Sequence, residues 1–187
     1  MTRKLDKFRI QPTNAEEIEA IANQKSLTPE EIAYHEAGHV GVGFAVGHYF
    51  NSVTILASED GIAGIAKSTD FWAAWARHPH KDKSHRTKKP VIEGVKNSIL
   101  VRLGGGIAEA KFTGKPLYLC GMGTDYEVAE ELAAYLWKQP NRLVRKMLYE
   151  TERIVEVQWK FIQKLADVLV EKKSLNKDEL VDFYHFF

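Results

Sequence analysis

Two histidines and a glutamate lie close together in the segment AYHEAGHV, residues 33–40. His35 and His39 are four positions apart, so on a helix their side chains lie on the same face, one turn from each other. Two imidazole nitrogens placed in this way can bind one zinc ion at about 2 Å. Glu36 follows the first histidine and can reach a zinc-bound water as a general base without being a ligand. The spacing therefore predicts a metal site that activates water.

The motif alone does not complete such a site. A catalytic zinc ion needs a third protein ligand and an open coordination position, and the two histidines could also be side chains that are merely packed or exposed. Asp125 is one candidate ligand, because it begins an expected helix after a glycine-rich loop, although aspartate is also a favoured helix cap there. Glu109 is the rival ligand, or else a buried acid paired within the helix packing. Cys120 could approach the metal, or serve as a small apolar filler.

The segment that carries the histidines has the signals of a central helix. Thr28 and Glu31 form a capping box and Pro29 takes the first helical position, which predicts a helix that runs to about Gly47. Three glycines lie inside it, and each costs roughly 1 kcal/mol relative to alanine: Gly38, Gly41 and Gly43. Glycines persist in a helix where another backbone packs close, so this helix is expected to be buried.

The remaining pattern predicts a mainly α (α+β) fold with a small β element. Further helices are expected over residues 15–24, 91–112, 125–138 and 141–172, with a terminal helix that Asn176 and Glu179 cap. The helix over 91–112 is expected to be interrupted at Gly104–Gly106. Residues 53–55 and 62–66 favour two strands joined by the turn Glu59–Gly61.

Length and composition limit the classes of protein to which this chain could belong. The chain has 187 residues, 44% of them hydrophobic, and a formal net charge of +1, which suits one globular unit and gives no support for nucleic-acid binding. We divide it into a tail with a short helix, 1–27, and one domain, 28–187. The single cysteine excludes an intrachain disulfide. With neither a signal peptide nor roughly 18 unbroken apolar residues, the expected location is cytoplasmic and soluble.

Beyond the HEAGH motif, the chain resembles the peptidase domain of FtsH-type ATP-dependent zinc metalloproteases over about residues 27–182. LGGGIAE, residues 103–109, is similar to the family's LGGRAAE helix. GTDYEVA, residues 123–129, is similar to its G-x-x-N-D-x-x-x-A segment, and LADVLVEKKSLNKDEL, residues 165–180, resembles its closing helices. The resemblance implies a helical zincin-like fold.

The same resemblance implies roles for individual residues. His35, His39 and Asp125 would be the ligands of Zn²⁺, with Glu36 as the general base. The segments Val53-Thr54-Ile55 and Ala63-Gly64 are similar to the family's strand pair, whose edge holds substrate in extended form. We therefore expect the edge of one of these strands to bind substrate by β-augmentation.

Two residues within these motifs depart from the family's pattern. Thr124 stands where the family has an asparagine, and Gly106 stands where its helix has an arginine. The family's ATPase module, with its phosphate-binding loop, and its membrane segments have no counterpart in the sequence. The expected function is therefore ATP-independent hydrolysis of peptide bonds in peptides or unfolded protein segments. The resemblance also implies a homo-oligomer. Two alternatives are a degenerate relative that serves as an interaction or assembly module, and a narrow regulatory peptidase with one protein substrate.

One segment has no evident counterpart in the family. Residues 70–89 begin with Phe71, Trp72 and Trp75 and continue as a basic run. The aromatic residues could form a lid over a substrate groove or pack against the core, and the basic run is expected to be a solvated loop. Tyr126 and His185 are candidates for stabilising an oxyanion.

Overall fold

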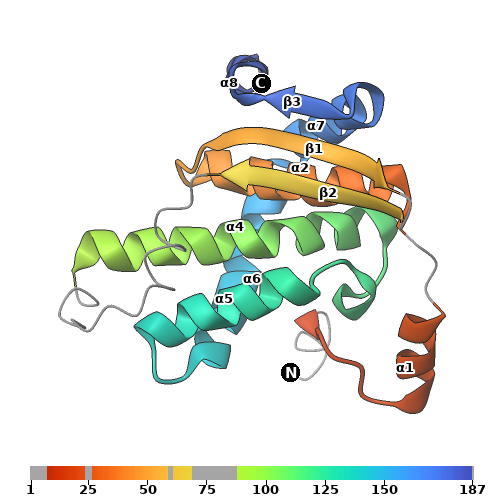
Figure 1. Cartoon of the computed structure of the whole chain (residues 1–187). Coiled ribbons are helices and arrows are strands. Elements are labelled where there is room, and N and C mark those ends of the chain that lie inside the picture. Colours follow the sequence, from red (N-terminus) through yellow and green to blue (C-terminus); the bar gives the residue numbers. More distant parts are fainter. Residues whose placement is uncertain (1–7, 24–26, 59–60, 69–87, 187) are drawn as a thin grey trace.

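The structure is a computed structural model that describes residues 8–23, 27–58, 61–68 and 88–186. Most of the described chain is helical, and one small antiparallel sheet accompanies the helices (Figure 1). The elements are α1 (Ala15–Ala22), α2 (Pro29–Ala45), β1 (Phe50–Ser58), β2 (Gly61–Ser68), α4 (Lys89–Thr113), the short 3₁₀ helix η4 (Leu117–Leu119), α5 (Gly123–Leu136), α6 (Pro140–Val157), α7 (Trp159–Lys172), β3 (Ser174–Asn176) and α8 (Lys177–His185). The predicted mainly α fold with a small β element is confirmed.

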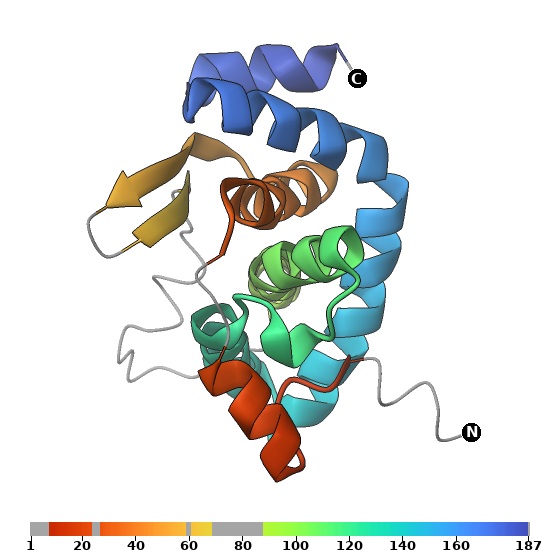
Figure 2. The ribbon, with the colours of Figure 1, turned by 90° about the vertical axis from the view of Figure 1, so that its right-hand side faces the viewer.

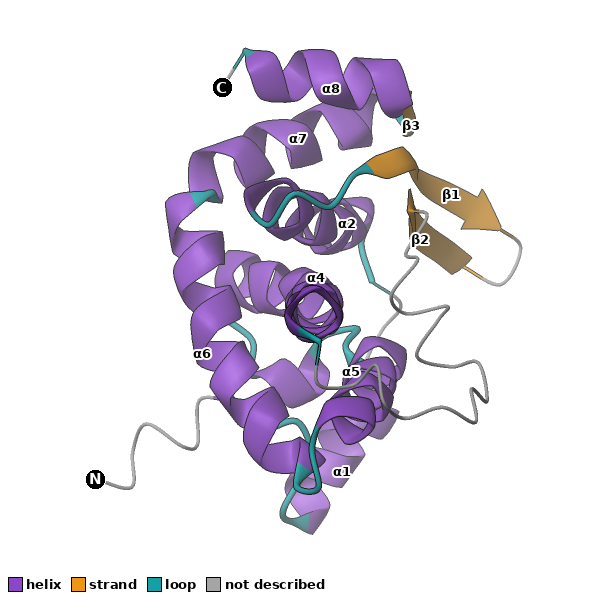
Figure 3. Cartoon of the chain, turned by 90° about the vertical axis from the view of Figure 1, so that its left-hand side faces the viewer, coloured by secondary structure: helices purple, strands orange, loops and turns teal. Residues whose placement is uncertain are grey.

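Helix α2 begins with the predicted capping box. The Glu31 N–H donates to the Thr28 hydroxyl at 3.2 Å, and the Thr28 N–H donates to the Glu31 carboxylate at 2.8 Å. The helix is buried for most of its length and lies between α7 and α4, with the sheet beside it (Figure 3). Where α2 meets α4, a Cβ atom added to Gly38 would lie 2.5 Å from the carbonyl oxygen of Gly104. Glycine therefore allows the two backbones to touch.

The course of helix α4 corrects the prediction of a break at its three glycines. Helix α4 runs from Lys89 to Thr113 without a break, so the expected interruption at Gly104–Gly106 is wrong. All three glycines are buried against neighbouring side chains or backbone, and the packing compensates for their low helix propensity.

A second correction concerns the predicted helix over 141–172. It consists of two helices, α6 and α7, that meet at Gln158, whose φ of −87° and ψ of 7° leave the helical region. The change of direction carries α7 across α2, where a Cβ atom on Gly41 would lie 2.7 Å from Cγ1 of Ile162. The segment contains no glycine or proline that would signal the turn, which packing against α2 stabilises.

The sheet has the strand order β2-β1-β3 and is antiparallel throughout. Val53 and Ile55 of the central strand are 0% and 2% exposed, and this face packs against α2. Leu56 and Ile65 lie on the opposite, exposed face. The alternation is that of a sheet with one solvated side.

The described N-terminal residues lie against the helices. Phe8 and Ile10 are partly buried against the core, and the ring of Phe8 packs edge-on to Tyr149 of α6 at a centroid distance of 4.7 Å. The first helix, α1, and the last helix, α8, lie at opposite ends of the molecule (Figure 2). Within the residues that the structure describes, none of the helices combines the length and apolar content that crossing a membrane requires.

Candidate metal centre

Three side chains from two helices meet beside α4. His35 and His39 lie one turn apart on α2, and Asp125 is the third residue of α5. The Oδ2 atom of Asp125 lies 3.3 Å from Nε2 of His35 and 3.2 Å from Nε2 of His39. One ligand atom from each residue falls within 4.8 Å of the other two. The structure thus brings the predicted trio together in a largely buried group that could hold a metal ion.

The hydrogen bonds around the two imidazoles fit a cation at the centre of this group. The Nδ1 atom of His39 lies 2.7 Å from the carbonyl oxygen of Val101, which can only accept, so this nitrogen carries a proton. Nδ1 of His35 donates in the same way to Glu109, at 2.9 Å. In the neutral rings, both Nε2 lone pairs then point towards the carboxylate of Asp125. The separations of 3.3 and 3.2 Å between Oδ2 of Asp125 and the two Nε2 atoms match the edges of a tetrahedron around a metal bound at about 2.0 Å.

Glu109, the rival ligand, lies behind His35 and outside the group of three. Its Oε2 atom accepts hydrogen bonds from Nδ1 of His35 and from the Gly121 N–H, both at 2.9 Å. The side chain is 0% exposed, and among the described residues no group hydrogen-bonds its Oε1 atom. Glu109 is therefore a buried acid paired within the packing, one of the two interpretations that the sequence leaves open. Such a carboxylate fixes the tautomer and orientation of a ligating histidine.

Helix α4 closes one side of the group. A Cβ atom on Gly105 would lie 2.5 Å from Nε2 of His39 and 2.6 Å from Nε2 of His35, so any side chain there would enter the space between the rings. One turn earlier, an Nη atom of Arg102 donates to Oδ1 of Asp125 at 3.2 Å. This bond leaves Oδ2 of Asp125 directed at the histidines. Sequence reasoning did not select Gly105 or Arg102, although helical spacing places both on one face of α4.

Burial and charge shift the proton affinities in the group in different directions. Burial favours the neutral ring of His35, but hydrogen bonds to Asp125 and Glu109 outweigh it and raise its pKa to about 10. Burial favours the protonated form of Asp125, yet the two histidines hold its pKa well below the usual range. Burial also raises the pKa of Glu36, against the opposing charges of the histidines. Asp125 is thus an anion, while Glu36 can hold a proton more readily than an ordinary carboxylate.

Glu36, His39 and Asp125 line one cavity of about 170 Å³. Arg102 and Val101 of α4 form one side of it, and the β2 residues Gly64, Ile65, Ala66 and Ser68 form the other. A Cβ atom on Gly64 would lie 2.4 Å from Oε1 of Glu36, so the strand passes directly over this carboxylate. The cavity gives a small molecule or an extended segment access to both the metal group and Glu36.

Among the residues that the structure describes, no strand pairs with β2 on the side away from β1. The Ile55 N–H donates to the carbonyl of Lys173 at 2.8 Å, away from β2. Ile55 and its partner Gly64 are therefore a non-hydrogen-bonded pair, whose N–H and C=O groups point outward. Ala66 has the same orientation, and its N–H donates to the carboxylate of Glu36. The outward N–H and C=O groups of Gly64 and the outward C=O group of Ala66 form an edge to which an extended peptide could add.

The pairing of β1 bears on which of the two predicted strands could offer an edge to a substrate. Val53 and Thr54 pair with β2 on one side and with β3 on the other, and Ile55 bonds to Lys173 in addition to its pairing with Gly64. A substrate strand therefore has no free backbone to pair with at these three positions. Of the predicted substrate-binding residues, Ala63 and Gly64 lie in the strand that has a free edge.

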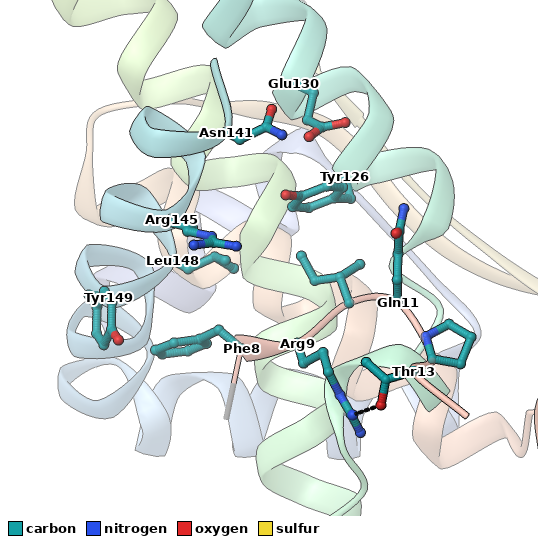
Figure 4. Close-up of a pocket in the computed structure, with 12 residues that line it drawn as sticks. Phe8, Arg9, Gln11, Thr13, Tyr126, Glu130, Asn141, Arg145, Leu148 and Tyr149 are labelled. Atoms are coloured by element: carbon teal, nitrogen blue, oxygen red, sulfur yellow. Dashed lines mark hydrogen bonds between the residues drawn. The ribbon is translucent and has the colours of Figure 1, made fainter. Parts of the chain in front are cut away.

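Other candidate residues lie elsewhere. Tyr126 lines a second cavity of about 540 Å³, between residues 8–13 and the helices α5 and α6, with Glu130 and Arg145 (Figure 4). His185 is the exposed last residue of α8. Cys120 is buried outside the group of three, its Sγ is 3.6 Å from the carbonyl oxygen of Pro116, and burial raises its pKa to about 12.

The aromatic residues Phe71, Trp72 and Trp75 and most of the basic run lie outside the described residues. Comparison of the chain with protein-family models and with curated proteins finds no match. The chemistry of the cavity and the resemblance of the sequence motifs are therefore the basis for a proposed function.

Proposed function

We propose that the protein is a zinc metalloendopeptidase that hydrolyses peptide bonds in peptides or unfolded protein segments without ATP. The observation that carries the proposal is that Glu36 shares one cavity with His39 and Asp125, while both histidine Nε2 atoms are directed at Asp125. The resemblance of the HEAGH, LGGGIAE and GTDYEVA segments to the FtsH-type peptidase domain supports the same assignment. That resemblance and the donor set of two imidazoles and one carboxylate favour zinc.

The residues of the candidate metal centre and Glu36 have distinct roles in this proposal. His35, His39 and Asp125 would hold the ion, with Glu109 and Val101 fixing the imidazole rings from behind. When bound, zinc supplies Lewis acidity, which polarises a peptide carbonyl and makes a water molecule more acidic. Glu36 would take the proton from that water and deliver it to the amine that leaves.

The raised pKa of Glu36 suits this proton transfer. A general base works best when its pKa is near the operating pH, because the group can then both accept and return a proton. Burial shifts Glu36 in that direction. The free edge of β2 would hold the substrate backbone beside Glu36, and backbone pairing favours extended, unfolded segments over a particular sequence.

The test is the variant Glu36→Gln, which keeps the shape of the side chain and removes the base. Purified wild-type protein should contain about one zinc per chain by mass spectrometry of the metal and should hydrolyse casein. Glu36→Gln should keep its zinc and lose at least about 10²-fold of the hydrolysis rate. Glu30→Gln removes a carboxylate from an exposed position on the same helix and should behave like the wild type.

Other outcomes would support the alternatives. A chain that binds no zinc and cleaves nothing would be an interaction or assembly module. A zinc-loaded chain that ignores casein but cleaves one partner protein would be a narrow regulatory peptidase. Equal hydrolysis of casein by the wild type and Glu36→Gln would contradict the role of Glu36.

A further inference from the structure

Arg102 is a cation inside the candidate active-site cavity. It lies on α4, its side chain is 34% exposed, and it lines the cavity together with Glu36, His39 and Asp125. In the part of the chain that the structure describes, its hydrogen-bond partner is Asp125, which takes one N–H of the guanidinium at 3.2 Å. A guanidinium has five N–H donors in a planar fork, so most of its capacity remains for another group.

Arg102 lies about one turn of α4 from the glycine that packs against the metal group. A Cβ atom added to this glycine, Gly105, would lie 2.5 Å from Nε2 of His39 and 2.6 Å from Nε2 of His35. Three residues of helix correspond to about 4.5 Å along the axis. Consecutive residues of an extended peptide are about 3.3 Å apart. A substrate strand on the edge of β2 would therefore bring a residue adjacent to the scissile bond within reach of Arg102.

The charges of the cavity select an anion of modest size. With a divalent cation bound, the positive charges of the ion and Arg102 balance the negative charges of Glu36, Asp125 and the buried Glu109 behind His35, so an added anion is favoured where it can pair directly with Arg102. The volume of about 170 Å³ is below the roughly 300–1,000 Å³ of pockets that enclose drug-sized ligands, so it suits one side chain or a chain end. The planar fork of arginine matches a carboxylate. The proximity of Glu36 and Asp125 disfavours more highly charged groups such as phosphate.

We infer that Arg102 is a specificity-determining residue that binds a substrate carboxylate, so that the protein prefers peptides with a carboxylate next to the bond that is cut. The inference rests on the proposed peptidase function and narrows its substrate class. Two sources carry this group, namely an aspartate or glutamate side chain and the C-terminal carboxylate of the peptide. In the second case the enzyme would remove residues from the end of the chain.

The experiment uses the zinc-loaded full chain and quenched fluorescent peptides of one parent sequence. One series carries glutamate or glutamine at each of the two positions on either side of the cleaved bond, and the other ends in a free acid or an amide. Wild-type kcat/KM should be at least about tenfold higher for the carboxylate at one position, the effect of a single charged hydrogen bond. The series that shows this preference identifies the source of the carboxylate.

The variant Arg102→Gln separates recognition from support of Asp125. It removes the charge and, because the glutamine side chain is shorter than arginine, also the hydrogen bond to Asp125. Activity is therefore compared as a ratio within each zinc-loaded protein. In the variant, kcat/KM for the preferred carboxylate peptide should fall to the value for its glutamine or amide partner, whereas loss of support for Asp125 alone would lower both values and leave their ratio unchanged. Arg102→Lys should restore part of the preference, because it returns the charge without the fork. Arg142→Gln, which removes the same charge from an exposed position on α6, should leave the preference intact.

Three outcomes would contradict the inference, and they show whether the proposed function fails with it. If the wild type cleaves peptides without preferring either carboxylate, the inference is wrong and the proposed function stands. If zinc-loaded Arg102→Gln loses activity equally on all peptides, so that the preference for the carboxylate persists, Arg102 only supports Asp125 and the inference is again wrong. If the zinc-loaded wild type cleaves none of the peptides and no casein, the proposed function fails and the inference fails with it.

Discussion

The Nδ1 atom of His35 donates a hydrogen bond to Oε2 of Glu109 at 2.9 Å, and no part of that carboxylate reaches solvent. The pair joins α2 to α4 directly behind the candidate metal group. Because the Gly121 N–H donates to the same oxygen, the loop before α5 is tied to this pair as well. The position of Asp125, four residues later on α5, thus depends on the same carboxylate that orients His35.

The charge of Glu109 should strengthen metal binding. In Glu109→Gln the amide oxygen can accept both hydrogen bonds, while the negative charge is lost. We expect the dissociation constant for zinc to rise about 10- to 100-fold, the usual effect of altering a partner of a ligating histidine. Competition with a chelator of known affinity measures it, and circular dichroism checks the fold. An unchanged zinc affinity would show that Glu109 serves packing alone.

A glycine at position 105 should be essential for metal binding, because it leaves the space between the two histidine rings open. The Cβ atom of Gly105→Ala would lie 2.5 Å from Nε2 of His39, which forces the ring or the helix to move. We expect at least the 10- to 100-fold loss of zinc affinity that disturbed metal surroundings produce, and a destabilisation of about 1–3 kcal/mol from overpacking. Gly123→Ala, where an added Cβ atom meets nothing within 4 Å, is the matched control and should bind zinc normally.

The substitution Gly64→Ala should lower the rate of hydrolysis without changing the zinc content. An added Cβ atom in Gly64→Ala would lie 2.4 Å from Oε1 of Glu36 and would displace that carboxylate, which is not among the three ligand residues. The expected result is a normal zinc content with hydrolysis of casein reduced by about 10²-fold, as for loss of a general base. Loss of zinc in this variant would contradict the separation of the two roles.

Zinc binding should release protons and should tighten as the pH rises. Because hydrogen bonds raise the pKa of His35 to about 10, the metal-free ring is protonated at neutral pH, and its proton must leave before Nε2 can bind. For one proton, the zinc affinity should increase about tenfold per pH unit until the pH approaches that pKa. Calorimetry in buffers of different ionisation enthalpy counts the protons. No release of protons at pH 7 would mean that His35 is neutral before the metal binds.

The local sequence determined where helices begin and which side chains share a helix face, because these features depend only on residues close together in the chain. The capping boxes at Thr28 and Asn176 set the starts of α2 and α8, because both partners of each hydrogen bond lie within one turn. The four-residue spacing of His35 and His39 puts both rings on one face of α2 wherever that helix packs.

Tertiary packing decided the contacts between residues that are more than one helical turn apart in the sequence. From the residues alone, Asp125 and Glu109 were both candidates to complete the group, since spacing along the chain gives no distance between helices. The close contact of α2 with α4 through Gly38 and Gly104 puts Glu109 behind His35, and the packing of α5 on α4 brings Asp125 to the front. In the described part of the chain, the pairing of β3 with β1 likewise leaves β2 as an edge strand beside Glu36, and the turn at Gln158 is stabilised by packing of α7 against α2. These outcomes depend on which surfaces meet, a property of the folded chain that no short segment contains.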